Sequence, residues 1–156
     1  MDVTVAATRE KVVMIEAGAD EIPDEIMYAG IVKAHEEIRK QIDFIDQIVA
    51  EIGDVKRFRN AASIVKYAGL NSGVDESGKY SAEGVPITKH GSPYLRRSLW
   101  LAANRARQYD PRLKEYYDKL RRKGKPHRVA VTAVARKLCH VVYAVMRDGK
   151  PYDPAK

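Results

Sequence analysis

The spacing of apolar residues divides the N-terminal third of the chain into a β segment and one long helix. Residues 2–6 alternate polar and apolar side chains, and residues 12–15 form a β-branched apolar run after a turn-like stretch, so two short strands are predicted. Over residues 24–52, apolar side chains recur at three- and four-residue intervals on one face, which predicts a helix. Gly53 follows as a typical helix-ending glycine.

Beyond residue 53, apolar spacing and capping residues predict further helices around one irregular loop. Ser92-Pro93 and Asp110-Pro111 each place a capping side chain before a proline at the first helical position. The loop is polar, contains glycines and has the composition of a hairpin. The loop covers residues 70–92, and the helices cover about 60–67, 93–108, 111–122 and 127–147. The predicted fold is mainly α, a helical domain preceded by a short β-hairpin and one long helix.

The same periodicity predicts which side chains the two longest C-terminal helices bury. The predicted buried residues are Leu95, Leu99, Ala102 and Ala106 in one helix, and Val134, Leu138, Val141 and Val145 in the other. Cys139 lies in the apolar run LCHVVYAV, which favours a buried packing thiol over a nucleophile. As the single cysteine, it excludes an internal disulfide and a multi-cysteine metal site.

Charge is distributed unevenly along the chain. Residues 1–54 hold 13 acidic and 5 basic side chains, whereas residues 55–156 hold 8 acidic and 23 basic side chains. A basic segment of this size suggests a polyanionic partner, of which nucleic acid is the commonest. The alternative is a basic surface that is simply solvated.

The chain shows no pattern of a signal peptide. It also shows no apolar stretch approaching the roughly 20 residues that a membrane span needs. We therefore expect no membrane association and a cytoplasmic location.

Several ordered motifs between residues 50 and 153 resemble one protein family. The motifs are AEIGDVKRF (50–58), YAGL (67–70), SGK (77–79), ITKHGSPYLRRSLWLAA (87–103), YDKLRRKGKPHRVAVTAVARKL (117–138) and YDP (152–154). They are similar to the C-terminal domain of DEDD-type insertion-sequence transposases, the serine-using group linked to bridge-RNA-guided recombination. The resemblance implies that residues 54–156 form a helical DNA-binding domain.

The resemblance also implies a site. Ser77 is the position that inherits the serine nucleophile, although by its own surroundings it is an ordinary turn serine. A hydroxyl that attacks a phosphodiester needs activation, and it needs cations where charge builds on the phosphate oxygens. The candidate nucleic-acid-binding residues are Lys79, Lys89, His90, Arg96, Arg97 and Arg105.

The arginines are predicted on the helix that starts after the loop. Arg96 and Arg97 fall in its first turn, where the free backbone amides also favour an anion. Arg97 and Arg105 are roughly two turns apart on one side and could follow a phosphate backbone. The alternative to phosphate binding is that Arg96 and Arg97 are simply solvated and that His90 is an ordinary surface histidine. Trp100 and the tyrosines of residues 109–117 could stack bases, or pack in the core.

The same family carries an upstream RuvC-like nuclease domain with four acidic metal ligands, which this sequence does not match. The resemblance therefore implies a divalent metal only in that absent domain, no cofactor in this chain, and no strand cleavage by this chain alone. Glu16, Asp20 and Glu21 follow a predicted strand, as metal carboxylates do in RuvC-like sites. The family's glycine-rich helix-hairpin-helix segment is also replaced here, by IDFIDQIV.

The first part of the chain resembles a second family. The run VTVAATREKVVMIEAGADEIPDEIMYAGIVKAHEEIRKQIDFIDQIVAEIG (3–53) is similar to the end of the first RNase PH-like core domain of polyribonucleotide nucleotidyltransferase. This resemblance implies that residues 1–53 form a β-β-α scaffold without phosphorolytic residues, and that the three acidic residues above belong to it. Both families carry AEIG (50–53), so the two resemblances together imply a chimera.

We therefore expect the DNA-binding C-terminal part of an insertion-sequence transposase, with structured guide RNA as a further candidate partner. The alternative is an inactive remnant of a polyribonucleotide nucleotidyltransferase fusion that binds RNA or self-associates. A part taken from a larger sheet leaves strand edges and apolar faces open. A homo-oligomer formed through the 24–52 helix or the C-terminal helices is therefore expected.

Overall fold

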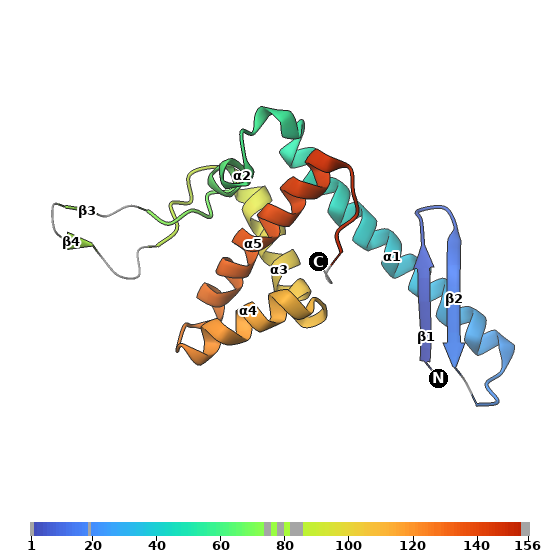
Figure 1. Ribbon diagram of the computed structural model, residues 1–156. Helices are drawn as coiled ribbons and strands as arrows, with labels where there is room; N and C mark the ends of the chain where they lie inside the picture. The colour runs from blue at the N-terminus through green and yellow to red at the C-terminus, as the bar shows by residue number, and fades with distance from the viewer. Residues whose placement is uncertain (1, 19, 74–75, 78–79, 82–85, 154–156) are drawn as a thin grey trace. The chain divides into compact units, whose positions relative to one another are not determined.

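The computed structural model describes residues 2–18, 20–73, 76–77, 80–81 and 86–153, and these residues are mainly helical (Figure 1). The strands are β1 (Asp2–Ala7), β2 (Val12–Gly18), β3 (Glu76–Ser77) and β4 (Tyr80–Ser81); the helices are α1 (Asp24–Ile52), α2 (Ala61–Tyr67), α3 (Pro93–Tyr109), α4 (Pro111–Arg122) and α5 (His127–Asp148), with a 3₁₀ turn η1 (Val55–Arg57). The predicted fold class is confirmed, and only the 3₁₀ turn was not expected.

The chain forms two compact units, Met1–Ala50 and Glu51–Lys156. The boundary falls inside the last turn of α1, so this helix contributes to both units. The family resemblances imply a different division, into residues 1–53 and 54–156. That division refers to which family each segment resembles, and it stays a prediction.

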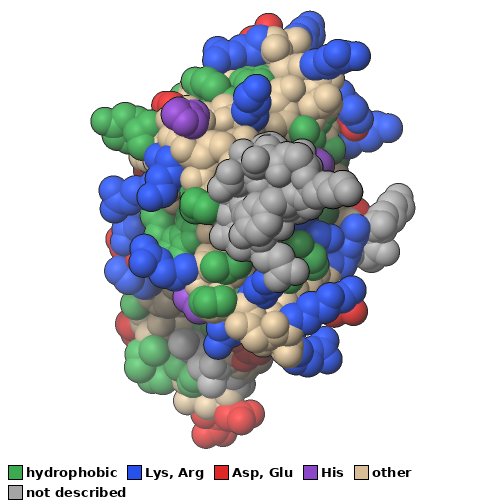
Figure 2. Space-filling model, turned by 90° about the vertical axis from the view of Figure 1, so that its left-hand side faces the viewer, with side chains coloured by type: hydrophobic (Ala, Val, Ile, Leu, Met, Phe, Trp, Pro, Cys, Tyr) green, Lys and Arg blue, Asp and Glu red, His purple; other side chains and the backbone are tan. Residues whose placement is uncertain are grey.

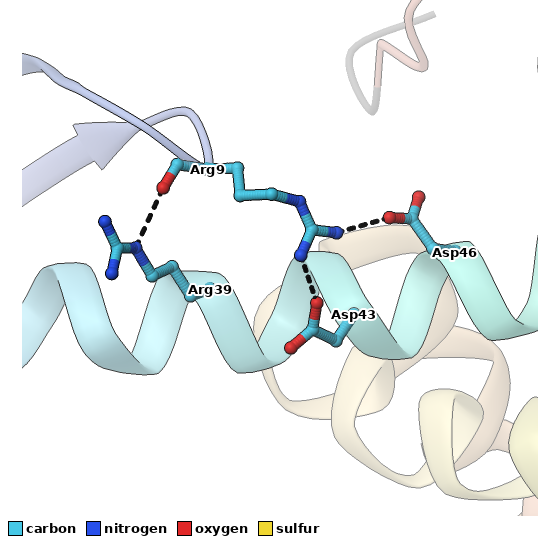
Figure 3. Close-up of polar contacts among 4 residues, drawn as sticks. All are labelled: Arg9, Arg39, Asp43 and Asp46. Atoms are coloured by element: carbon cyan, nitrogen blue, oxygen red, sulfur yellow. Dashed lines mark hydrogen bonds and ion pairs between the residues drawn. The ribbon is translucent and has the colours of Figure 1, made fainter.

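In the first unit, β1 and β2 pair antiparallel, from Asp2 opposite Gly18 to Ala6 opposite Met14. Polar contacts hold the turn of this hairpin on α1 (Figure 3). The guanidinium of Arg9 donates to the carboxylates of Asp43 and Asp46, and Arg39 Nε donates to the carbonyl of Arg9 at 2.8 Å. His35 Nε2 lies 3.0 Å from the carbonyl of Thr8. These contacts are exposed, so they specify where the turn sits more than they stabilise it.

Much apolar surface of the first unit is exposed. On α1 the predicted stripe is half-buried from Met27 to Ile38, but other apolar side chains of the helix face outward. The exposed large apolar residues of this unit are Val13, Met14, Ile15, Ile26, Tyr28, Val32, Ile45 and Val49. Where such exposed apolar side chains form a contiguous patch, the patch marks an interaction surface.

The core of the second unit lies among α2, α3, α4 and α5. α3 packs against α5, α4 packs against both, and α2 packs against α5 (Figure 1). The largest fully buried side chains are Ile52, Ile64, Leu70, Leu95, Leu99, Val131, Val134 and Cys139. Burying a Leu, Ile or Val side chain stabilises the folded state by about 1.5–3 kcal/mol.

The buried faces differ in part from those predicted. On α3, Ala103 is buried, whereas Ala102 and Ala106 are only half-buried. The buried residues of α5 are Ala130, Val131, Val134, Ala135, Cys139 and Tyr143, while Leu138, Val141 and Val145 are half-buried. Because α5 packs on three other helices, it buries more of its circumference than a single stripe, and small side chains permit the close approach.

The predicted capping residues are confirmed. Ser92 Oγ accepts a hydrogen bond from the amide of Leu95 at 3.1 Å and donates to the carboxylate of Glu51 at 2.5 Å. Asp110 accepts from the amide of Leu113 at 2.9 Å, and the hydroxyl of Tyr152 donates to the same carboxylate at 2.8 Å. Each cap therefore also joins two segments of the second unit.

Within the described part of the chain, one helix is long and apolar enough to cross a membrane by length and composition. This helix is α5, which has 22 residues and contains an 18-residue window with a mean hydropathy of 1.5. The expectation that no stretch approaches such a length is therefore wrong. The helix supplies six buried residues to the helical core, and 28% of its apolar window is buried.

Burial raises the pKa of the Cys139 thiol to about 12, and the side chain is 0% exposed. Only the thiolate reacts with alkylating agents, so at pH 8 we expect iodoacetamide to label the native protein about a thousandfold more slowly than the urea-unfolded chain. Mass spectrometry over a time course measures both rates. Equal rates in the two states would contradict the buried position.

Candidate nucleic-acid interface

The loop between α2 and α3 is closed at its base by hydrogen bonds between its two arms. We call this base, residues 67–73 and 86–92, the loop neck. Its backbone bonds run from Thr88 N to Asn71 O (2.9 Å), Lys89 N to Gly69 O (3.1 Å), Ser92 N to Tyr67 O (2.9 Å) and Gly73 N to Pro86 O (3.0 Å). The hydroxyl of Thr88 also donates to the amide oxygen of Asn71 at 2.8 Å.

Two glycines permit the arms of the neck to meet. Gly91 has φ +129°, and a Cβ at this position would lie 2.0 Å from the carbonyl oxygen of Tyr67. Gly69 has φ +64°, and a Cβ there would lie 2.8 Å from both Arg96 Nη1 and the carbonyl oxygen of His90. Both sites combine a left-handed backbone with missing space, so a side chain is excluded at each.

Two arginines from the helical core hold the neck. Arg96 of α3 donates from Nη1 to the carbonyls of Ala68 and Lys89, each at 3.2 Å. Arg136 of α5 donates from Nε to the carbonyl of Leu70 at 2.6 Å and from Nη2 to the hydroxyl of Ser72 at 3.2 Å. Arg96 is half-buried and bound to backbone, so its position differs from that of a free surface cation.

The predicted nucleophile lies in the segment that the neck closes. Ser77 is in β3, where its backbone pairs with Tyr80 of β4. The side chain of Ser77 and the whole of Lys79 lie outside the described residues. The structure therefore describes the two arms of the neck, through which the chain enters and leaves this segment. Both arms lie at the N-terminal end of α3.

Lys89 and His90 occupy the exit arm of the neck, and both side chains are exposed. Lys89 has φ +56°, a left-handed conformation that is uncommon for a residue with a side chain. This backbone turn directs the chain from the neck toward the cap of α3.

Beside the neck lies an open hollow of about 530 Å³, which we call the aromatic hollow. Its lining residues are Phe58, Ser63, Lys66, Tyr67, Asn71, Thr88 and His90. The rings of Phe58 and Tyr67 lie 5.4 Å apart between centroids, tilted by 59°. The guanidinium of Arg57 lies 5.1 Å from each of these two ring centroids.

Along α3, exposed cationic, aromatic and apolar side chains share one face. Tyr94, Arg97, Leu101, Arg105 and Tyr109 follow one another at three- or four-residue intervals, and all are exposed. We call these five residues the α3 stripe. The guanidinium of Arg105 lies 5.1 Å from the ring centroid of Tyr109, and Arg97 and Arg105 are about 12 Å apart along the helix axis.

The other aromatic candidates pack inside the second unit. Trp100 meets the ring of His127 edge-on at 6.4 Å, and Tyr117 meets it at 5.8 Å. The hydroxyl of Tyr117 is also 2.8 Å from His127 Nδ1, and Arg107 lies 4.6 Å above the Tyr117 ring. The sequence left base stacking and core packing open for these residues, and Trp100 and Tyr117 pack inside the second unit.

Basic side chains are abundant outside these features. On the face shown in Figure 2, Lys and Arg side chains outnumber Asp and Glu side chains. Exposed residues of the α4–α5 connection contribute to the basic character of the second unit, namely Lys119, Arg121, Arg122, Lys123, Lys125 and Arg128. A polyanion would thus meet a favourable potential over a wide surface.

No group of three or more His, Cys, Asp or Glu side chains in the described ranges could hold a metal ion. Glu16, which lies in β2, and Asp20 and Glu21, which follow this strand, form no such group.

The sequence patterns missed Arg57, Lys66, Tyr94 and Arg136. Tyr94 could have been found, because it shares the helical period of Arg97 and Arg105. Arg136 had a weaker signal, a charged residue within the apolar run of α5. Arg57 gave no signal, since only the folded chain brings it to Tyr67. Lys66 is next to Tyr67 in the sequence, but only the fold places both at the aromatic hollow.

Comparison with known proteins identifies relatives of both parts. Residues 43–118 match the family model described as Transposase IS116/IS110/IS902 family. The insertion element IS110 uncharacterized 43.6 kDa protein of Streptomyces coelicolor is 34% identical over 106 residues, which are 68% of this chain and 26% of that protein.

Polyribonucleotide nucleotidyltransferases also match. The enzyme of Ruminiclostridium cellulolyticum is 52% identical over 64 residues, 41% of this chain and 9% of the enzyme. That of Clostridioides difficile is 52% identical over 56 residues, 36% of this chain and 8% of the enzyme. Both predicted resemblances are confirmed, and the chain spans only a small part of the length of each of these relatives.

The neck can be tested through Gly91. We expect Gly91→Ala to lower the free energy of unfolding by about 2–4 kcal/mol, because the added Cβ collides with the Tyr67 carbonyl. Gly124→Ala is the matched control, since Gly124 has φ +75° but no atom within 4 Å of an added Cβ, and we expect a loss of about 1 kcal/mol. Urea unfolding followed by circular dichroism measures both, and equal losses would contradict the close approach.

Proposed function

Because the chain from residue 43 to residue 118 belongs to the IS116/IS110/IS902 transposase family, we propose that the second unit is a DNA-contacting part of an insertion-sequence transposase. In this proposal the intact recombinase uses Ser77 as its nucleophile. The activity of the whole protein requires regions outside the matched segment, and this chain alone binds DNA without cutting it.

The α3 stripe is the observation that carries the proposal. Arg97 and Arg105 are exposed on one helix face, about 12 Å apart, which is a suitable separation for phosphates of one strand. Tyr94 and Tyr109, 77% and 70% exposed, extend the same face at both ends. Arginine binds phosphate oxygens with two parallel hydrogen bonds, and exposed tyrosines contact sugars and bases.

Lys89 and His90 extend this surface toward the loop. Both are exposed and immediately precede the cap of α3, so they can contact the same phosphate backbone as Arg97. Lys79 is proposed as a further cation beside Ser77, from its place in the sequence. Arg96 is assigned to positioning, because its guanidinium already binds the carbonyls of Ala68 and Lys89.

The proposed chemistry is attack of the Ser77 hydroxyl on a DNA phosphorus. A bond forms between the serine oxygen and phosphorus, and the bond from phosphorus to one bridging sugar oxygen breaks. The serine proton leaves to solvent or a base, and the released sugar oxygen takes up a proton. The product is a phosphoserine link and a free sugar hydroxyl, and cations around the phosphate lower the barrier as negative charge builds.

The stripe is tested by removing its charges. We expect Arg97→Ala/Arg105→Ala to weaken binding of duplex DNA of any sequence and to reduce the slope of log affinity against log salt by about two. Lys11→Ala, an exposed cation of the first unit, is the control and should leave the slope unchanged. Fluorescence anisotropy at several salt concentrations gives both quantities. Binding that does not depend on salt, or no binding, would refute the proposal.

The nucleophile is tested by trapping an adduct. With the family's RuvC-like domain supplied separately with Mg²⁺, we expect a covalent protein–DNA species on denaturing gels that is absent from Ser77→Ala. Ser81→Ala is the matched control, since Ser81 lies in the facing strand β4, and its adduct should persist. An adduct that survives Ser77→Ala, or no adduct in any variant, would remove Ser77 from the role.

A further inference from the structure

The aromatic hollow is lined by aromatic, polar and basic side chains together. Its rings, Phe58 and Tyr67, present apolar surface, while Lys66 adds a cation and His90 an imidazole to the lining. None of the described lining residues is acidic. Apolar flat surface beside a cation that no lining carboxylate opposes suits a heterocyclic base attached to a phosphate.

Arg57 contacts two of the rings that line the hollow. Its guanidinium lies at the same 5.1 Å distance from the Phe58 and Tyr67 ring centroids, so it is held over the rings by cation–π contacts. It forms no ion pair with a described carboxylate within 4.0 Å. A guanidinium ordered in this way can stack on a base and still face a phosphate.

The size of the hollow matches a single nucleotide. Its volume of about 530 Å³ lies in the range of small-molecule sites, roughly 300–1,000 Å³. It is open to the surface, so a residue of a polymer can enter while the strand continues outside. A base within a duplex is stacked on both faces and cannot reach into such a concavity.

The polar lining suits the edge of a base. The amide oxygen of Asn71 is occupied by the hydroxyl of Thr88, which leaves hydroxyl lone pairs of Thr88 as acceptors. The amide nitrogen of Asn71 makes only a long contact of 3.5 Å with the carbonyl of Ser72, so it can donate to a ligand. Donor and acceptor atoms therefore lie beside the rings on which the base would stack.

We infer that the aromatic hollow binds one unstacked nucleotide of the nucleic acid, with the base against the Tyr67 ring that Arg57 contacts and its phosphate near Lys66 and His90. This inference rests on the proposed DNA binding and adds a preference for an unpaired nucleotide beside the loop neck. The site would hold a locally opened strand next to the segment that carries Ser77.

The test uses the full chain and two DNA hairpins that differ by one unpaired 2-aminopurine nucleotide in the stem. We expect about tenfold tighter binding of the bulged hairpin and a change of its 2-aminopurine fluorescence. Lys66→Ala and Arg57→Ala should reduce the preference to about twofold or less. Both side chains are exposed, so the variants should fold, which circular dichroism checks.

Lys114→Ala is the matched control, because it removes one exposed charge from α4, outside the hollow. It should weaken both hairpins equally and keep the preference. Equal affinity of the unmodified chain for both hairpins would overturn the hollow alone and leave the proposed DNA binding intact. No affinity for either hairpin would overturn both. A preference that survives Lys66→Ala and Arg57→Ala would place the unpaired nucleotide elsewhere.

Discussion

The close approach of Gly91 to the Tyr67 carbonyl is the constraint on which the candidate interface depends. It ties the start of α3 to the end of α2, so the long loop between them leaves and re-enters the helical unit at one place. Bringing the ends of such a loop together costs chain entropy. The backbone bonds of the neck and the donors of Arg96 and Arg136 offset that cost, and they satisfy carbonyls that would otherwise lack partners.

This constraint gives two adjacent arginines different tasks. Successive residues of a helix are about 100° apart around its axis, so Arg96 turns toward the neck while Arg97 stays exposed. Two adjacent arginines after a loop therefore need not both bind phosphate. The exposed partner of Arg97 is Arg105, two turns along the helix, and the two belong to a stripe that also contains tyrosines.

The two units differ in how much of their apolar surface they bury. The second unit has a core drawn from α2, α3, α4 and α5, with basic residues outside it. The first unit relies on exposed polar contacts of Arg9 and Arg39 to hold its hairpin on α1, and it leaves apolar side chains of β2 and α1 exposed. The chain matches a short segment of a polyribonucleotide nucleotidyltransferase and part of an insertion-element protein, so this contrast accompanies similarity to two families.

The sequence by itself determined the five helices and the places where they start. Caps such as Ser92 and Asp110, with prolines after them, specify a helix start through local hydrogen bonds, and apolar periodicity specifies the length. The tertiary structure alone decided the face that α5 buries, the structural task of Arg96 and Arg136, and the meeting of Arg57 with Tyr67. Those outcomes depend on contacts between residues distant in the chain, for which local spacing carries no information.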